Sequence, residues 1–276
     1  SRHDYSWGTE INYPNDFFFF CQGYMQIGEG FVSGLGFVPR KNIRNIYGHI
    51  GLGPRPEKFG ILQVRSRLNY YMIHDLNDGG FRSSKANLKI LHIELISGEE
   101  LGVDYAWQRE ALDHDFRIID EVVIPADTYG FKWYELELQT AKRRNFWVNA
   151  GLRRGSFYNG KRNDWDIQGG WQVAIPVFIG VESERAYVYL DQGDFITQIF
   201  RVNLNLLFSP NLTWYNFAQY DNQSETIGAQ SRFQWIFKSG KELFVVWNSP
   251  GISDPLSRFQ MDEYEARLKI KYTMRF

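Results

Sequence analysis

The sequence predicts an all-β fold, an antiparallel transmembrane β-barrel to which this chain contributes about 14–16 strands, as a whole barrel or as part of a larger one. The first reason is a strict alternation of apolar and polar residues near the chain end. The second is an alternation of longer and shorter connections between the expected strands. The third is that no helical stretch and no run of about 18 uncharged apolar residues occurs, which excludes a helical membrane protein.

The segment 264–276 shows the alternation in its strictest form. Its even positions, from Tyr264 to Phe276, are apolar or aromatic, and its odd positions are charged or polar. Because side chains of a β-strand point alternately to two faces, the segment has one apolar and one charged face. An apolar face that continues to a terminal aromatic is typical of the closing strand of an outer-membrane barrel. We expect lipid to contact this face, and Phe276 to be the assembly signal for the outer-membrane insertion machinery.

The rest of the chain divides into segments of similar character, separated by turns rich in Gly, Pro, Asn and Asp. Segment 2–12 is ambiguous, and alternation becomes strong from Ile61 onward. We see no linker, so residues 1–276 are expected to form one barrel domain. The expected strands are 17–28, 43–52, 61–72, 89–95, 101–110, 134–139, 146–153, 164–174, 178–189, 199–208, 212–220, 232–237, 243–247 and 264–276.

The connections between these strands alternate in length. Short periplasmic turns and long extracellular loops give outer-membrane barrels this pattern, whereas a soluble β-sandwich, the alternative fold, has no reason to show it. The difference in length from the neighbouring connections is small at 53–58 and at 190–194. The expected shorter connections are 13–16, 53–58, 97–100, 140–144, 175–177, 209–211 and 238–241, and the longer ones are 29–41, 75–81, a polar loop at 111–128, 155–163, 190–194, 221–226 and 248–262.

Composition narrows the possible functions. Aromatic residues make up 17% of the 276 residues, while the mean hydropathy of −0.40 and 23% charged residues leave ample polar surface for the inside of a barrel. A net charge of −1 gives no reason to expect nucleic acid as a partner. The single cysteine, Cys21, excludes an intrachain disulfide framework.

The start of the chain shows no signal peptide. If the last strand runs toward the periplasm, counting back makes a strand at 2–12 run in the same direction, so the chain would enter it from the extracellular rim. We therefore expect this chain to be the C-terminal part of a longer precursor that lacks its N-terminal region, or a barrel closed by another chain.

The polar faces of the strands are expected to line the barrel lumen. Acidic residues concentrate on strands between about 94 and 139 and basic ones elsewhere, and such segregation can select solutes in a pore. The alternative is a network of salt bridges that fills the lumen. The candidate lumen and selectivity residues are Arg65, Arg67, Glu94, Asp104, Glu135, Glu137, Arg201, Arg232, Arg267, Lys269 and Lys271.

No catalytic or metal-binding set emerges from the sequence. His114 lies between Asp113 and Asp115 and could act as a general base, but a solvated charged loop explains it as well. The pairs Asp164 with Asp166 and Asp191 with Asp194 supply too few oxygens for calcium. Nucleophile-elbow, Walker-type and dinucleotide-binding motifs are absent. We expect the protein to have no enzymatic activity and to bind no cofactor or metal.

Several short motifs point to a known family. They occur in order at 36–40, 190–195, 208–212, 219–220, 231–235 and 242–248. With them the chain, from about Tyr13 to Phe276, resembles the uncharacterised C-terminal barrel domain of Bacteroidota-type proteins that carry an N-terminal domain like carbohydrate-binding-module family 9. The resemblance implies the outer membrane of a Gram-negative bacterium and a missing N-terminal region, but no known activity. Ser239-Gly240 stands where family members usually have Pro-Gly.

Two functions follow as expectations. The first is a channel or transport component with a charged lumen and an unknown substrate. The second is a plugged structural or assembly subunit that docks partner membrane proteins through its extracellular loops. A barrel-embedded hydrolase or carbohydrate-processing protein is less well supported, because no catalytic set accompanies it.

Overall fold

The computed structural model describes residues 4–34, 36–249 and 265–273. These residues form an all-β structure, and no helix among them is long and apolar enough to span a membrane. The strands are β1 (Ser6–Tyr13), β2 (Phe18–Ile27), β3 (Ile43–Leu52), β4 (Ile61–Asp75), β5 (Phe81–Leu95), β6 (Glu100–Ala111), β7 (Phe116–Ile119), β8 (Val122–Ile124), β9 (Thr128–Gln139), β10 (Phe146–Phe157), β11 (Gly160–Ala174), β12 (Val177–Leu190), β13 (Gly193–Ser209), β14 (Leu212–Asp221), β15 (Thr226–Lys238), β16 (Lys241–Ser249) and β17 (Glu265–Tyr272).

Fifteen of these strands form one sheet in chain order from β1 to β17, without β7 and β8. This confirms the predicted all-β class, and the ambiguous first segment is indeed a strand, β1, paired antiparallel with β2. Among the described residues β1 and β17 each pair with one neighbour only. Among these residues no pairing between β1 and β17 closes the sheet into a barrel.

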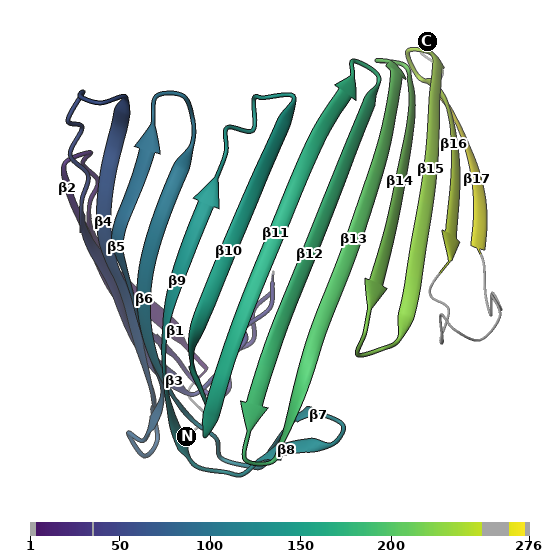
Figure 1. Cartoon of the computed structure of the whole chain (residues 1–276). Coiled ribbons are helices and arrows are strands. Elements are labelled where there is room, and N and C mark those ends of the chain that lie inside the picture. The colour runs from purple at the N-terminus through teal and green to yellow at the C-terminus, as the bar shows by residue number, and fades with distance from the viewer. Residues whose placement is uncertain (1–3, 35, 250–264, 274–276) are drawn as a thin grey trace. The chain divides into compact units, whose positions relative to one another are not determined.

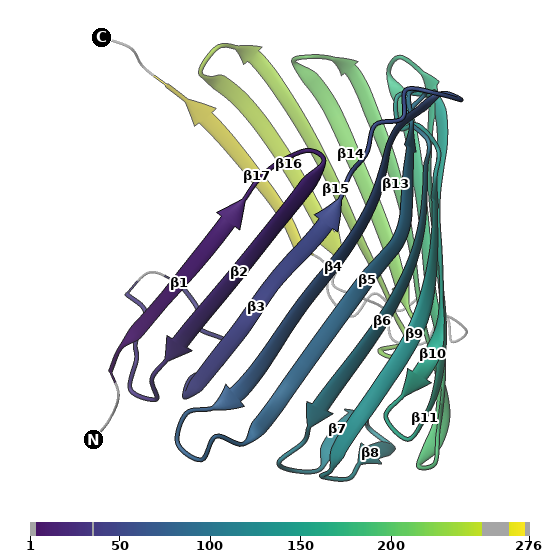
Figure 2. The same cartoon turned by 90° about the vertical axis from the view of Figure 1, so that its left-hand side faces the viewer.

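The chain divides into two compact units. The first comprises the chain up to Leu138 together with 152–163 and 188–195, and the second comprises 139–151, 164–187 and 196–276. In the first unit β1 to β6 lie side by side in chain order, each antiparallel to the next (Figure 2). In the second, β13 to β17 follow the same rule.

The strand register decides which side chains share a face, because directly paired residues of an antiparallel ladder point to the same side. In the first unit Arg67 pairs with Lys89, and Lys89 pairs with Asp104, so all three lie on one face. The neighbouring position Leu68 pairs with Leu88, which pairs with Tyr105 on the opposite face. The predicted separation of polar and apolar faces is thus present in the structure.

The connection 111–128 differs from the predicted polar loop. It contains the small hairpin of β7 and β8, which lies beside the turn between β12 and β13 (Figure 1). Val122 and Ile124 point inward and are buried against Val188 and Leu190. The prediction failed because the two strands are short, and their two inward side chains are too few to reveal a period of two.

This hairpin provides a first test of stability. Replacing Ile124, which has no exposed surface, by Val removes one buried methylene group and should lower local stability by about 1 kcal/mol. Hydrogen exchange of residues 112–127 should rise correspondingly. The control is Val123→Ala on the outward face of the same strand, where 37% of the residue is exposed and exchange should change little. Equal effects of the two substitutions would contradict the packing described here.

The predicted alternation of loop lengths is wrong in the middle of the chain. Connections 155–163 and 190–194 were expected to be long, but β10 to β13 are joined there by the tight turns 158–159 and 191–192. Positive φ angles occur at both reversals, at Tyr158 with φ 48° in the first turn and at Gly193 with φ 142° where β13 begins. Conversely, 53–60 is longer than 76–80, so the expected order is reversed at that pair.

Candidate functional site

The first unit gathers most of the predicted lumen residues on its polar face. Arg65 pairs in register with His92, and Arg67 with Lys89. Asn15, Asp16, Phe19, Gln63 and Asn69 join these four in lining a pocket of about 330 Å³. The guanidinium of Arg67 also lies 5.8 Å from the centre of the Phe19 ring, which holds this long side chain along the sheet.

Acidic residues of the same face are paired with bases more closely than the sequence indicated. Glu135 forms a bidentate ion pair with Arg153, at 2.9 and 3.2 Å. Glu137 lies 4.0 Å from Lys89. Asp104 is 5% exposed. The acidic band expected between about 94 and 139 is therefore partly neutralised, because Lys89 and Arg153 on neighbouring strands enter it.

Glu94 lies at the end of the same polar face. It pairs in register with Gln63 on β4 and with Glu100 on β6. Glu100 in turn lies 3.2 Å from His92. The predicted residues Arg65, Arg67, Glu94, Asp104, Glu135 and Glu137 thus belong to one connected polar surface.

In the second unit, Arg201 is the best-anchored predicted residue. Its guanidinium lies 2.6 Å from Glu182 and 2.5 Å from Glu184, and its Nε donates to Gln219 at 2.9 Å. The sequence did not identify either carboxylate, because β12 has weak alternation. The structure thus places three side chains, from the strands β12 and β14 on either side of β13, around one guanidinium.

The remaining predicted residues of the second unit lie along β15 to β17. Arg232 and Arg267 both pair in register with Val246, so they share a face. On that face, Lys269 pairs with Phe244 and Lys271 makes a 3.3 Å ion pair with Glu242. Phe276, the expected assembly signal, lies outside the described residues.

The residues considered for catalysis and calcium binding have other contacts. Asp113 pairs with Arg82 at 2.6 Å, and Asp115 accepts the backbone N–H of Ala126. Asp194 accepts the backbone N–H of Leu190. Over the described ranges no three His, Cys, Asp or Glu side chains gather in a way that could hold a metal ion.

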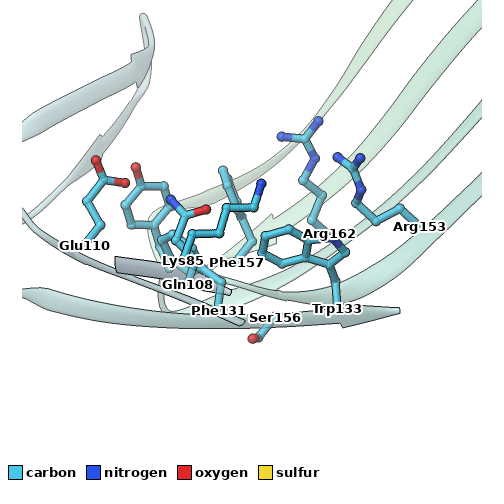
Figure 3. A pocket seen from close by; sticks show the side chains of 11 residues that line it. Lys85, Gln108, Glu110, Phe131, Trp133, Arg153, Ser156, Phe157 and Arg162 are labelled. Carbon is cyan, nitrogen blue, oxygen red and sulfur yellow. The ribbon is translucent and has the colours of Figure 1, made fainter. Parts of the chain in front are cut away.

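A second pocket in the first unit was not predicted from the sequence. It has a volume of about 220 Å³, and four aromatic side chains form much of its wall (Figure 3). Phe131, Phe157 and Tyr158 pack with ring centres 4.8 to 5.6 Å apart, and Trp133 lies nearby. We call this cavity, with the four rings that line it, the aromatic pocket.

Three cationic side chains surround the aromatic pocket. Lys85 Nζ lies 5.1 Å and the Arg153 guanidinium 5.8 Å from the centre of the Trp133 ring. The Arg162 guanidinium lies 5.3 Å from that of Phe157. Burial raises the pKa of the Tyr158 phenol to about 12, with a further contribution from Glu110.

No family model matches the chain, and no curated protein matches it either. The sequence did contain a sign of the aromatic pocket. Phe131, Trp133, Glu135 and Glu137 all occupy odd positions of β9, so two aromatic and two acidic side chains lie on one face of this strand.

Proposed function

We propose that the chain is an outer-membrane β-barrel protein whose apolar face contacts lipid and whose polar face lines a water-filled channel. The observation that carries this proposal is the large number of exposed apolar side chains on one face of each unit. In the first unit they include Ile50, Leu52 and Leu138, each about half exposed. In the second they include Leu268 and Ile270, 67% and 72% exposed. A patch of this kind indicates a covering partner, and lipid suits its size and composition.

Polar groups on the apolar face support the same proposal, because lipid supplies no hydrogen bonds and such groups must be satisfied within the protein. Trp214 donates from Nε1 to Ser231 at 2.7 Å, and Ser231 donates to the side-chain oxygen of Asn216 at 2.9 Å. Similarly, the Tyr70 hydroxyl donates to Gln22, whose amide donates to the backbone oxygen of Tyr47. These groups have partners within their own face.

The polar face favours the channel over a plugged subunit in one respect. It carries two pockets, of about 330 and 220 Å³, lined by charged side chains of β4, β5, β6, β10 and β11. A face filled by salt bridges alone would leave less open volume. The second candidate, a plugged assembly subunit that docks partners, is supported by the ion pairs of Glu135, Glu137 and Glu182. The resemblance to the Bacteroidota-type barrel domain fits either role, and neither requires a catalytic group or a cofactor.

Planar-bilayer recordings test the proposal. The purified chain should insert into bilayers and give discrete conductance steps, with ion selectivity set by lumen charges. Absence of current at any voltage, despite proteolytic protection of the strands in liposomes, would exclude the channel and favour the plugged subunit. Absence of insertion would exclude both.

Charge reversal provides a sharper prediction for the same recordings. Changing Arg267, Lys269 and Lys271 to Glu reverses three charges on the polar face of β17 and should shift the reversal potential strongly toward cation selectivity. The matched control is Lys241→Glu at the start of β16, since Lys241 lies over the Tyr272 ring, which belongs to the opposite face. Unchanged selectivity in the triple variant would contradict placement of these residues in the lumen.

A further inference from the structure

The aromatic pocket combines two kinds of surface that suit different parts of one ligand. Its wall consists of the rings of Phe131, Trp133, Phe157 and Tyr158. The charged ends of Arg153 and Arg162 point away from the strand that lies beneath the rings (Figure 3). Cations that lie along aromatic rings keep their apolar stems on the ring and their charged ends toward water. The pocket is therefore apolar at its wall and cationic at its mouth.

The charges at the mouth do not all cancel within the protein. Glu135 pairs with Arg153, and Glu110 lies 3.7 Å from Arg40. Lys85 differs from these residues, because no carboxylate in the described parts of the chain lies within 4.0 Å of its ammonium group. That ammonium group lies 5.1 Å from the centre of the Trp133 ring. A positive charge at the edge of an apolar pocket attracts an anion.

The backbone beside the pocket is held in an unusual conformation. Tyr158 has φ 48°, a region that costs a bulky residue free energy and that turns usually fill with Gly or Asn. Asn and Gly, the residue types found at the next two positions, Asn159 and Gly160, adopt a positive φ at a lower cost in free energy. Tyr158 adopts it while its ring packs 4.9 Å from Phe131 and 5.1 Å from Tyr129. The strained turn thus places a phenol ring in the pocket wall.

We propose that the aromatic pocket is a binding site for a small amphiphilic anion, a planar apolar ring that bears one carboxylate, phosphate or sulfate group. The ring packs against Trp133 and Phe157, and the anionic group approaches Lys85. The volume of about 220 Å³ is smaller than that of pockets for drug-sized ligands, about 300–1,000 Å³, so a single ring fits best. This proposal requires only the polar face of the first unit and does not depend on insertion of the sheet into a membrane.

Isothermal titration of the full chain in detergent, with phenylacetate as the probe and empty micelles as the blank, tests the site. Phenylacetate should bind saturably with a Kd of about 0.1–1 mM, as expected for about ten non-hydrogen atoms. Acetate, which lacks the ring, and phenylacetamide, which lacks the charge, should bind at least about tenfold more weakly. Equal affinity for acetate or for phenylacetamide would overturn the proposal, as would the absence of saturable binding.

Variants locate the binding. Lys85→Met keeps the apolar stem and should weaken phenylacetate binding about tenfold, and Trp133→Leu should weaken it by a similar factor. Lys132→Met, next to Trp133 but on the opposite face of β9, is the matched control and should bind as the unaltered chain does. Unchanged affinity in Lys85→Met, or equal losses in Lys85→Met and Lys132→Met, would overturn the assignment. Lys85→Met removes the charge of a partly exposed side chain and keeps its apolar stem, so its result can be interpreted even if Trp133→Leu does not fold.

Discussion

Gly155→Ala should destabilise the protein by about 3 kcal/mol and abolish binding at the aromatic pocket. A Cβ at position 155 would lie 2.0 Å from the backbone oxygen of Lys132 and 2.4 Å from the Cβ of Trp133. Neither atom belongs to a flexible side-chain end, so the strand pair must separate to make room. Urea titration of the folded chain should show the loss of stability, and phenylacetate titration should show the loss of binding.

The control for this substitution lies on the adjacent strand. Gly130→Ala also adds one methyl group, but no atom lies within 4 Å of the new Cβ. Its stability should be unchanged or slightly higher, because Ala has fewer conformations than Gly in the unfolded chain. If both variants were equally stable, the close approach of Gly155 to Trp133 would be wrong.

The second large effect is expected at Arg201. Arg201→Met leaves Glu182 and Glu184 facing one another without their shared cation and should cost about 2 kcal/mol. The side chains are a quarter to nearly half exposed, which keeps the value below that of a fully buried pair. Urea titration in detergent or liposomes measures the change.

Two further variants separate charge from packing at this site. Adding Glu182→Gln and Glu184→Gln to Arg201→Met should restore most of the lost stability, because the unpaired charges are then gone. Arg267→Met removes the partner of Glu265, but both side chains are at least half exposed, so a change below about 0.5 kcal/mol is expected. Failure of the triple variant to recover would show that Arg201 acts by packing rather than by charge.

Local pattern predicted the strands well but the connections poorly. The alternation from Ile61 onward identified the faces of β4 correctly, since Gln63, Arg65 and Arg67 do share a side. Strand ends were misplaced where polar residues continue a strand, as in β5, which begins at Phe81 rather than near Lys89. Residues such as Ser83 and Lys85 have polar side chains but ordinary ladder pairing, which composition does not reveal.

The sequence by itself determined the all-β class, the two faces and the polar character of one of them, because a period of two is a local property of the chain. Only the tertiary structure decided which residues of that face meet. Arg201 with Glu182 and Glu184, and Lys85 with Trp133, come together across strands. Their contacts depend on register, and register is set by pairing between segments rather than by the pattern within either one.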